Sequence, residues 1–146
     1  MQEGNSEFYR IDDRFATRPY QHCYFDLLDP QLGTDFARIS TKIGGGFPLY
    51  NSLAHLDHTT GQVEVYFPGR THLVQEPVFI PRKNSNIEGD GHVLALVNNY
   101  DTMASELHLL DTRNFAHAQA KILLPVRLRQ GLHGSWVDAS EFETEK

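Results

Sequence analysis

The sequence predicts an all-β fold, and three observations support this prediction. Apolar residues alternate with polar ones over short runs, which is typical of strands with one buried face. Segments rich in Gly, Pro, Asp and Asn separate these runs at short intervals, as turns do. No stretch has an apolar period of 3.6 residues that is long enough to predict a helix. Short strands at regular spacing are typical of barrels, sandwiches and propellers, and alternation does not choose among these architectures.

The N-terminal half contains three predicted elements. The aromatic run QHCYFDLLDP at 21–30 predicts a strand that ends at Asp-Pro. The alternating run ARISTKI at 37–43 predicts another strand, and the glycines at 44–46 that follow it predict a bend. Residues 49–69 predict an antiparallel hairpin, because two alternating arms flank DHTTG, and the turn is expected near Thr59–Gly61.

The C-terminal half also predicts strands. The short run EPVFIPR at 76–82 is bounded by prolines, and AQAKILLPVRL at 118–128 is a further strand candidate. Between them, residues 91–112 predict a second hairpin with a longer polar turn near Tyr100–Ser105.

One stretch inside the second hairpin, TMASELHLLDTRNF, also has features of a short helix. The alternation of Leu107 and Leu109, and the position after NNYD, favour a strand. The two predicted hairpins share a loose strand–turn–strand pattern. This pattern is a weak indication of a repeat with roughly the length of a propeller blade.

Composition limits the functions that the chain can have. With 146 residues, of which 11% are aromatic and 22% charged, it has the composition of one globular domain with its own core. A net charge of −6 without a Lys/Arg cluster argues against nucleic acid as a partner. No apolar stretch approaches the length of a transmembrane span, and the polar start MQEGNSEF is no targeting signal. The single cysteine, Cys23, predicts a reducing compartment and favours a cytoplasmic location.

Eight histidines make a metal site worth considering. His55 and His58 are three residues apart at the expected hairpin tip, where such side chains point to opposite faces, so we expect solvated turn residues. Five others stand alone among polar neighbours and are expected to be exposed or singly hydrogen-bonded: His22, His72, His92, His108 and His117. No Cys-rich, HExxH or EF-hand spacing is present, and the glycines at 44–46 lack the lysine and helix of a phosphate loop.

The remaining histidine, His133, lies in LPVRLRQGLHGSWV near the C-terminus. Spacing alone favours a core histidine with a satisfied hydrogen bond. Three segments in order, 6–25, 75–97 and 108–137, change this interpretation, because they resemble the carotenoid cleavage oxygenase family. The intervening segment 44–69 resembles the family as well. This family includes stilbene-cleaving dioxygenases and the retinoid isomerase of the visual cycle, and fungal lignostilbene-type members are the most similar in character.

The most specific motifs are EPVFIPR followed by ExDG, and LP followed by GxHGxW. The resemblance implies a seven-bladed β-propeller with iron(II) on its axis, held by four histidines whose rings are oriented by glutamates. The last of these ligands matches His133, and the orienting glutamates match Glu76 and Glu7. Without the resemblance both glutamates would be ordinary exposed strand residues. Family members commonly have proline where this chain has Tyr9, a departure that concerns the backbone beside Glu7.

Neutral imidazoles suit iron(II), and an all-histidine site leaves coordination positions open for dioxygen. A carboxylate that accepts the other ring N–H fixes the tautomer and the ring plane. The implied activity is oxidative cleavage of a conjugated C=C bond of a carotenoid, apocarotenoid or stilbene, giving two carbonyl products. The implied partners are this apolar substrate and dioxygen, and the resemblance leaves peripheral membrane contact of the full enzyme open.

The resemblance maps to the C-terminal third of such an enzyme. Residues 1–146 are therefore expected to be a C-terminal fragment of one propeller domain, with the other three histidine ligands upstream of residue 1. We expect no catalysis from the chain alone, because one imidazole does not retain iron(II). The alternative is a truncated, non-catalytic β-module that binds a partner or a hydrophobic ligand.

Overall fold

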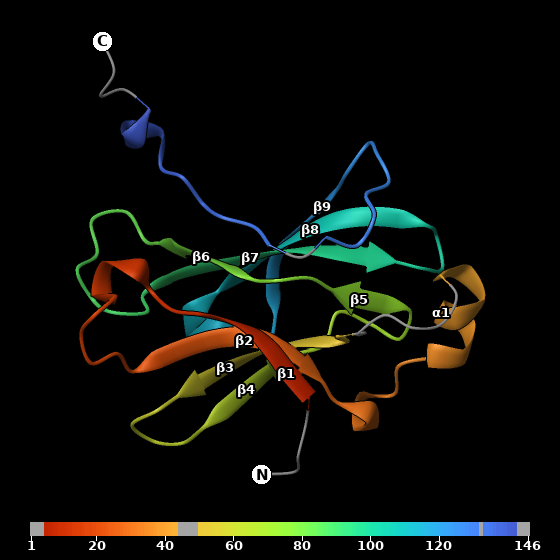
Figure 1. Ribbon diagram of the computed structural model, residues 1–146, viewed down its shortest axis with the longest axis horizontal. Helices are drawn as coiled ribbons and strands as arrows, with labels where there is room; N and C mark the ends of the chain where they lie inside the picture. The colour runs from red at the N-terminus through yellow and green to blue at the C-terminus, as the bar shows by residue number, and fades with distance from the viewer. Residues whose placement is uncertain (1–4, 44–49, 132, 143–146) are drawn as a thin grey trace.

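The computed structural model describes residues 5–43, 50–131 and 133–142, which form two antiparallel sheets (Figure 1). The first sheet has the strand order β1-β2-β3-β4, with β1 Asn5–Arg10, β2 His22–Leu28, β3 Ser52–Asp57 and β4 Val63–Tyr66. In the second sheet the order is β5-β7-β8-β9, and β6 also pairs with β7. Its strands are β5 His72–Val74, β6 Val78–Pro81, β7 Gly91–Asn99, β8 Ala104–Asp111 and β9 Ala118–Leu123. The prediction of an all-β fold is confirmed.

Both predicted hairpins are present. Strands β3 and β4 pair antiparallel around a turn in which Gly61 has φ 71° and the Asp57 carboxylate accepts the Thr59 N–H. Strands β7 and β8 pair in the same way, and the Asn99 side chain accepts the Asp101 N–H within their turn. Asp and Asn side chains that accept main-chain N–H groups two residues on are a common device in tight turns.

The predicted strand at 37–43 is wrong, because this segment is the helix α1, Phe36–Ile43. The Asp35 carboxylate accepts the Arg38 N–H and so caps the helix start. Phe36, Ile39 and Ile43 share one face of α1 and pack near β5 and the β7–β8 turn (Figure 1). With only eight residues, the alternating and helical patterns overlap, and burial of this face decides between them. The expected bend at 44–46 lies outside the described residues.

Smaller differences concern strand ends and two strands that were not predicted, β1 and β5. Strand β9 ends at Leu123, earlier than the predicted run to residue 128. After β9 the chain runs back over the second sheet without regular strand structure and then extends away from it (Figure 1). Strand β1 was not predicted at all, and it carries the first candidate site residue, Glu7. Within the described residues, no helix is long and apolar enough to cross a membrane.

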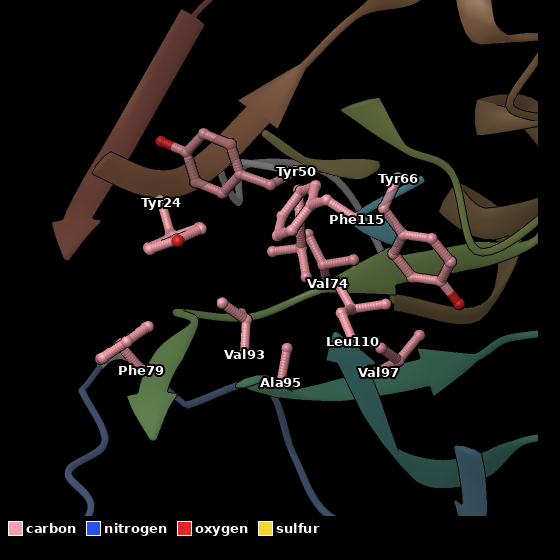
Figure 2. Close-up of a cluster of buried hydrophobic side chains, with 11 residues drawn as sticks. Tyr24, Tyr50, Tyr66, Val74, Phe79, Val93, Ala95, Val97, Leu110 and Phe115 are labelled. Carbon is pink, nitrogen blue, oxygen red and sulfur yellow. The ribbon is translucent and has the colours of Figure 1, made fainter. Parts of the chain in front are cut away.

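The core lies between the two sheets (Figure 2). Tyr24 from β2 stacks on Phe79 from β6, with ring centroids 5.5 Å apart and planes 13° from parallel. Val93 from β7 and Leu110 from β8 are fully buried in the same cluster, which Leu53 from β3 joins. Burying one such apolar side chain contributes about 1.5–3 kcal/mol to the free energy of unfolding. This contact fixes one sheet relative to the other and so positions β1 against the segment that carries His133.

Candidate metal-ligand site around His133 and Glu76

The structure brings His133 and Glu76 into contact. The Nδ1 atom of His133 lies 3.1 Å from Oε2 of Glu76, and the Gly134 N–H donates to the same oxygen over 3.0 Å. The Glu76 side chain is 6% exposed, whereas the His133 side chain is 74% exposed. The contact between His133 and its orienting acid is therefore present, but the ring faces outward from this chain, contrary to the expectation of a histidine that is not turned to solvent. When a neutral imidazole donates from Nδ1, its lone pair is on Nε2, which is the atom that can bind a metal.

Local structure explains why these two residues meet. Glu76 precedes Pro77 and strand β6, which places its carboxylate at the edge of the second sheet. The C-terminal segment is tied to the same place, since the Gly131 N–H donates to the Gln75 side chain over 2.7 Å. Two neighbouring residues, Gln75 and Glu76, therefore hold both sides of His133 through main-chain N–H groups.

A third group completes the environment of Glu76, and the sequence analysis missed it. Arg10, at the end of β1, donates from Nη2 to Glu76 Oε1 over 2.6 Å and to the Gly134 carbonyl over 2.7 Å. The only sequence signal for this residue was its position three residues after Glu7 in one motif.

Glu7 lies on β1, and within the described residues it makes no contact with His133. It is exposed and pairs in register with Asp26 of β2. Between Glu7 and Arg10 the pairing shifts register, and Phe8 has φ 58°, so the strand contains a bulge. The bulge directs Phe8 toward His133, with ring centroids 5.6 Å apart at 80°.

Tyr9 occupies the position where proline is common in the family that the sequence resembles. Its ring stacks on Phe25 at 4.8 Å, on the outer side of the first sheet. Tyr9 therefore does not disturb the bulge that carries Glu7.

Four residues at or beside the site have buried polar atoms without a hydrogen-bond partner in the described part of the chain, namely Asp26, Tyr50, Arg10 and Gln75. Neither carboxylate oxygen of Asp26 has a hydrogen-bond partner in the described residues, and Asp26 is fully buried. Burial, with added repulsion from Glu76 and Glu7, raises the pKa of Asp26 to about 8. The Tyr50 hydroxyl is another such group, and burial together with Glu7 raises its pKa to about 12. The site therefore lies next to a strongly desolvated, acid-rich region.

A pocket of about 220 Å³ adjoins His133 and Glu76. Its walls are mainly apolar side chains of the second sheet, namely Val78, Leu94, Ala95, Leu96 and Leu107. A small apolar space beside a few convergent polar groups is the usual form of a small-molecule site.

The donor set suits a metal only in part. An imidazole held in one tautomer by a buried carboxylate is a good ligand for a borderline metal such as iron(II). In the part of the chain that the structure describes, however, no group of three or more His, Cys, Asp or Glu side chains could hold a metal ion. This chain therefore supplies one candidate ligand and its orienting acid.

The expectation that His55 is a solvated turn residue is wrong. His55 lies inside β3 and is buried, because the turn begins only after Asp57. Its Nε2 is 3.0 Å from Nδ1 of His22, and its Nδ1 is 3.2 Å from Glu64. His22 is therefore not isolated either. His58 is exposed, as expected.

The expectation for His108 is also wrong. This residue is fully buried in β8, with Nδ1 2.7 Å from the Tyr66 hydroxyl and Nε2 2.7 Å from Glu106. Burial lowers the pKa of His108, which keeps the ring neutral. His117 makes one contact, with Asn114, as expected. None of these contacts links a further histidine to His133.

Known proteins with a similar sequence cover almost all of this chain. A resveratrol cleavage oxygenase from Aspergillus fumigatus is 77% identical over 145 residues, which are 99% of this chain and 29% of that protein. The carotenoid cleavage oxygenase 1 of Neurospora crassa is 49% identical over 97% of this chain and 27% of its own length. The chain thus spans less than a third of the length of these relatives.

A solved structure agrees with the fold. The lignostilbene dioxygenase of Pseudomonas brassicacearum matches with a TM-score of 0.83 and 38% identity, over 92% of this chain and 27% of that chain. This similarity confirms the prediction of an all-β piece of the family's propeller. The family model of the retinal pigment epithelial membrane protein, RPE65, matches residues 1–138. The chain therefore belongs to the RPE65 family, which is the carotenoid cleavage oxygenase family indicated by its sequence motifs.

Proposed function

We propose that residues 1–146 are the C-terminal part of a single seven-bladed propeller domain in a non-haem iron(II) dioxygenase. The enzyme cleaves the central C=C bond of a stilbene with dioxygen and releases two aldehydes. The observation that carries this proposal is the pair formed by His133 and the buried carboxylate of Glu76, 3.1 Å apart. The substrate class follows from relatives named for resveratrol and lignostilbene, the first of them 77% identical to this chain.

His133 would hold the metal through Nε2. Glu76 accepts the Nδ1 proton and so keeps the lone pair on the nitrogen that faces the metal. Glu7, exposed on β1, would orient in the same way a histidine that lies outside this chain. Iron(II), when bound, supplies the activation of dioxygen, and the protein supplies geometry and a dry cavity.

The exposure of the His133 ring agrees with this role. A ligand on the axis of a propeller must face the other blades, so its ring is expected to project from the blades that carry it. The adjoining pocket of about 220 Å³ is lined mainly by apolar side chains, which suits a flat conjugated substrate and keeps water from the reacting bond.

The alternative, a non-catalytic β-module, has less support. Such a module would have no need for a buried carboxylate that receives an imidazole, a peptide N–H and a guanidinium at once. We place the enzyme in the cytoplasm, because the one cysteine, Cys23, is a free and buried thiol.

The proposal is tested with the full-length protein, loaded anaerobically with iron(II) and then given resveratrol and oxygen. We expect two aromatic aldehydes in equal amounts, each with one oxygen atom from labelled dioxygen. His133→Ala is expected to abolish cleavage. His117→Ala is the matched control and should leave the rate unchanged, since the His117 side chain is exposed and bonds Asn114. Cleavage that survives in His133→Ala, or its absence in the iron-loaded protein, contradicts the proposal.

A further inference from the structure

Strand β1 ends in Arg10, whose side chain bonds both Glu76 and the candidate ligand segment. Arg10 lies in the first sheet, whereas Glu76 precedes a strand of the second sheet and Gly134 belongs to the C-terminal segment. We infer that Arg10 is a positioning residue of the metal site, which fixes the direction of the His133 ring by holding Glu76 and Gly134 together. This inference rests on the proposed function, because it concerns the orientation of a ligand to iron(II).

The hydrogen bonds of the Glu76 carboxylate are divided between its two oxygens. Oε1 accepts from Arg10, and Oε2 accepts from the His133 ring and from the Gly134 N–H. A carboxylate has room for about four such bonds, so three donors from two segments, β1 and the C-terminal segment, leave it little freedom to rotate. The orientation of Oε2 toward His133 is therefore set by the bond that Arg10 makes to Oε1.

Arg10 also holds the main chain directly after His133. Its Nη2 atom donates to the Gly134 carbonyl over 2.7 Å, while the N–H of the same residue donates to Glu76 over 3.0 Å. Both polar groups of Gly134 are thus fixed by the Arg10–Glu76 pair. The segment after β9 has no strand partner in the described residues, so such side-chain contacts are what hold it in place.

The ring of His133 has little other support. Its side chain is 74% exposed, and among the described residues its ring packs on the edge of Phe8 at 5.6 Å. A ring packed on one side only would rotate about its side-chain bonds without the Nδ1 contact. The link from Arg10 through Glu76 therefore determines the ring orientation, in place of core packing.

The charge of Arg10 is a second reason why an arginine is needed beside Glu76. Glu76 is 6% exposed, and a buried carboxylate without a cation is costly. Arg10 is 29% exposed and its Nε has no partner in the described part of the chain, and its bonds to Glu76 and Gly134 both come from Nη2. A lysine ammonium is also a single nitrogen with several protons, which makes Arg10→Lys the conservative variant.

The test uses the full-length protein with ¹⁵N-labelled histidine, free of metal and at fixed pH, with the His133 signal assigned by its loss in His133→Gln. In the unchanged protein we expect the proton of the neutral ring on Nδ1. In Arg10→Met we expect a mixture of the two tautomers, together with a loss of iron(II) affinity of roughly 10–100-fold. Arg10→Lys should restore most of both properties.

Arg14→Met is the matched control. Arg14 is 34% exposed and also bonds a buried acid, Asp12, at 2.6 Å, but it does not touch Glu76. It should lower stability without changing the His133 tautomer. The inference is overturned if Arg10→Met keeps the Nδ1 proton, or if Arg14→Met changes the tautomer equally. A tautomer that responds to Arg10 in a full-length protein that binds no iron would overturn the proposed function and support positioning by Arg10.

Discussion

Glu76 and His133 are 57 residues apart in the sequence, and their side chains approach to 3.1 Å. Neither residue belongs to a strand, and both are placed by what flanks them: β6 after Glu76, and the Gly134 N–H after His133. Both partners of the pair lie within this chain, where the acid is buried and the imidazole projects outward.

Glu76→Gln is expected to preserve the fold and to weaken iron retention in the full-length protein by roughly 10–100-fold. The amide has the size of the carboxylate but lacks its charge, so it is a poorer acceptor for both His133 and Arg10. Iron content after dialysis measures the effect, and circular dichroism checks the fold. Glu64→Gln is the control, because Glu64 faces His55 far from this site. Equal iron loss in both variants would contradict a specific role for Glu76.

Tyr66→Phe is expected to destabilise the protein by about 1–3 kcal/mol, because it leaves the buried Nδ1 of His108 without its partner. Tyr50→Phe is a matched control, since Tyr50 is equally buried but its hydroxyl has no partner within the described residues. That substitution should cost almost nothing. Denaturant unfolding of both variants gives the comparison, and equal losses would show that the Tyr66–His108 bond contributes little.

The hairpins could be predicted from the sequence because their information is local. Turn residues such as Asp57 and Asn99 act on the main chain two residues away, and alternation marks the arms on either side. Helix α1 could not be predicted in this way, because alternation and a helical face overlap in a segment of eight residues. Contact with Leu73 and Tyr100, which are distant in sequence, decides its conformation.

In the candidate site, too, residues within a local motif could be predicted and residues whose role depends on distant partners could not. His133 and Glu76 were found through their motifs, which resemble those of a known family. Arg10 was missed because a strand-end arginine has no pattern of its own, and its role depends on two partners far along the chain. The buried bonds of His108 were missed for a similar reason, since burial is a property of the packed sheets and its partner Tyr66 is distant in the sequence.

The chain of residues 1–146, titrated anaerobically with iron(II), is expected to show no tight stoichiometric binding. One imidazole competes poorly with water, and affinity comes from several ligands placed in advance. Isothermal calorimetry or equilibrium dialysis provides the measurement. One-to-one binding with a Kd below about 1 μM, which is a binding free energy of roughly 8 kcal/mol, would reveal a ligand set beyond His133. His22 and His55, whose facing nitrogens are 3.0 Å apart, would then be replaced first.

The pH dependence of stability should report the buried carboxyl of Asp26. Burial first, and then the charges of Glu76 and Glu7, raise its pKa to about 8, against an ordinary value of 3.8 in the unfolded chain. Because the folded state holds this proton more tightly, the contribution of protonated Asp26 to stability is complete below about pH 4 and is lost as the pH rises toward 8.

The variant Asp26→Asn cannot ionise, so its stability does not fall with pH for this reason. Its free energy of unfolding, relative to that of the unchanged protein, should increase steadily from pH 5 to pH 8, by several kcal/mol at about 1.4 kcal/mol per pH unit. Urea unfolding at pH 5, 6, 7 and 8 measures the difference. Asp57→Asn, at the end of β3, removes a carboxyl whose pKa is lowered and should show no such increase. A constant difference between Asp26→Asn and the unchanged protein over this range would mean that Asp26 ionises in the folded state at its ordinary pKa.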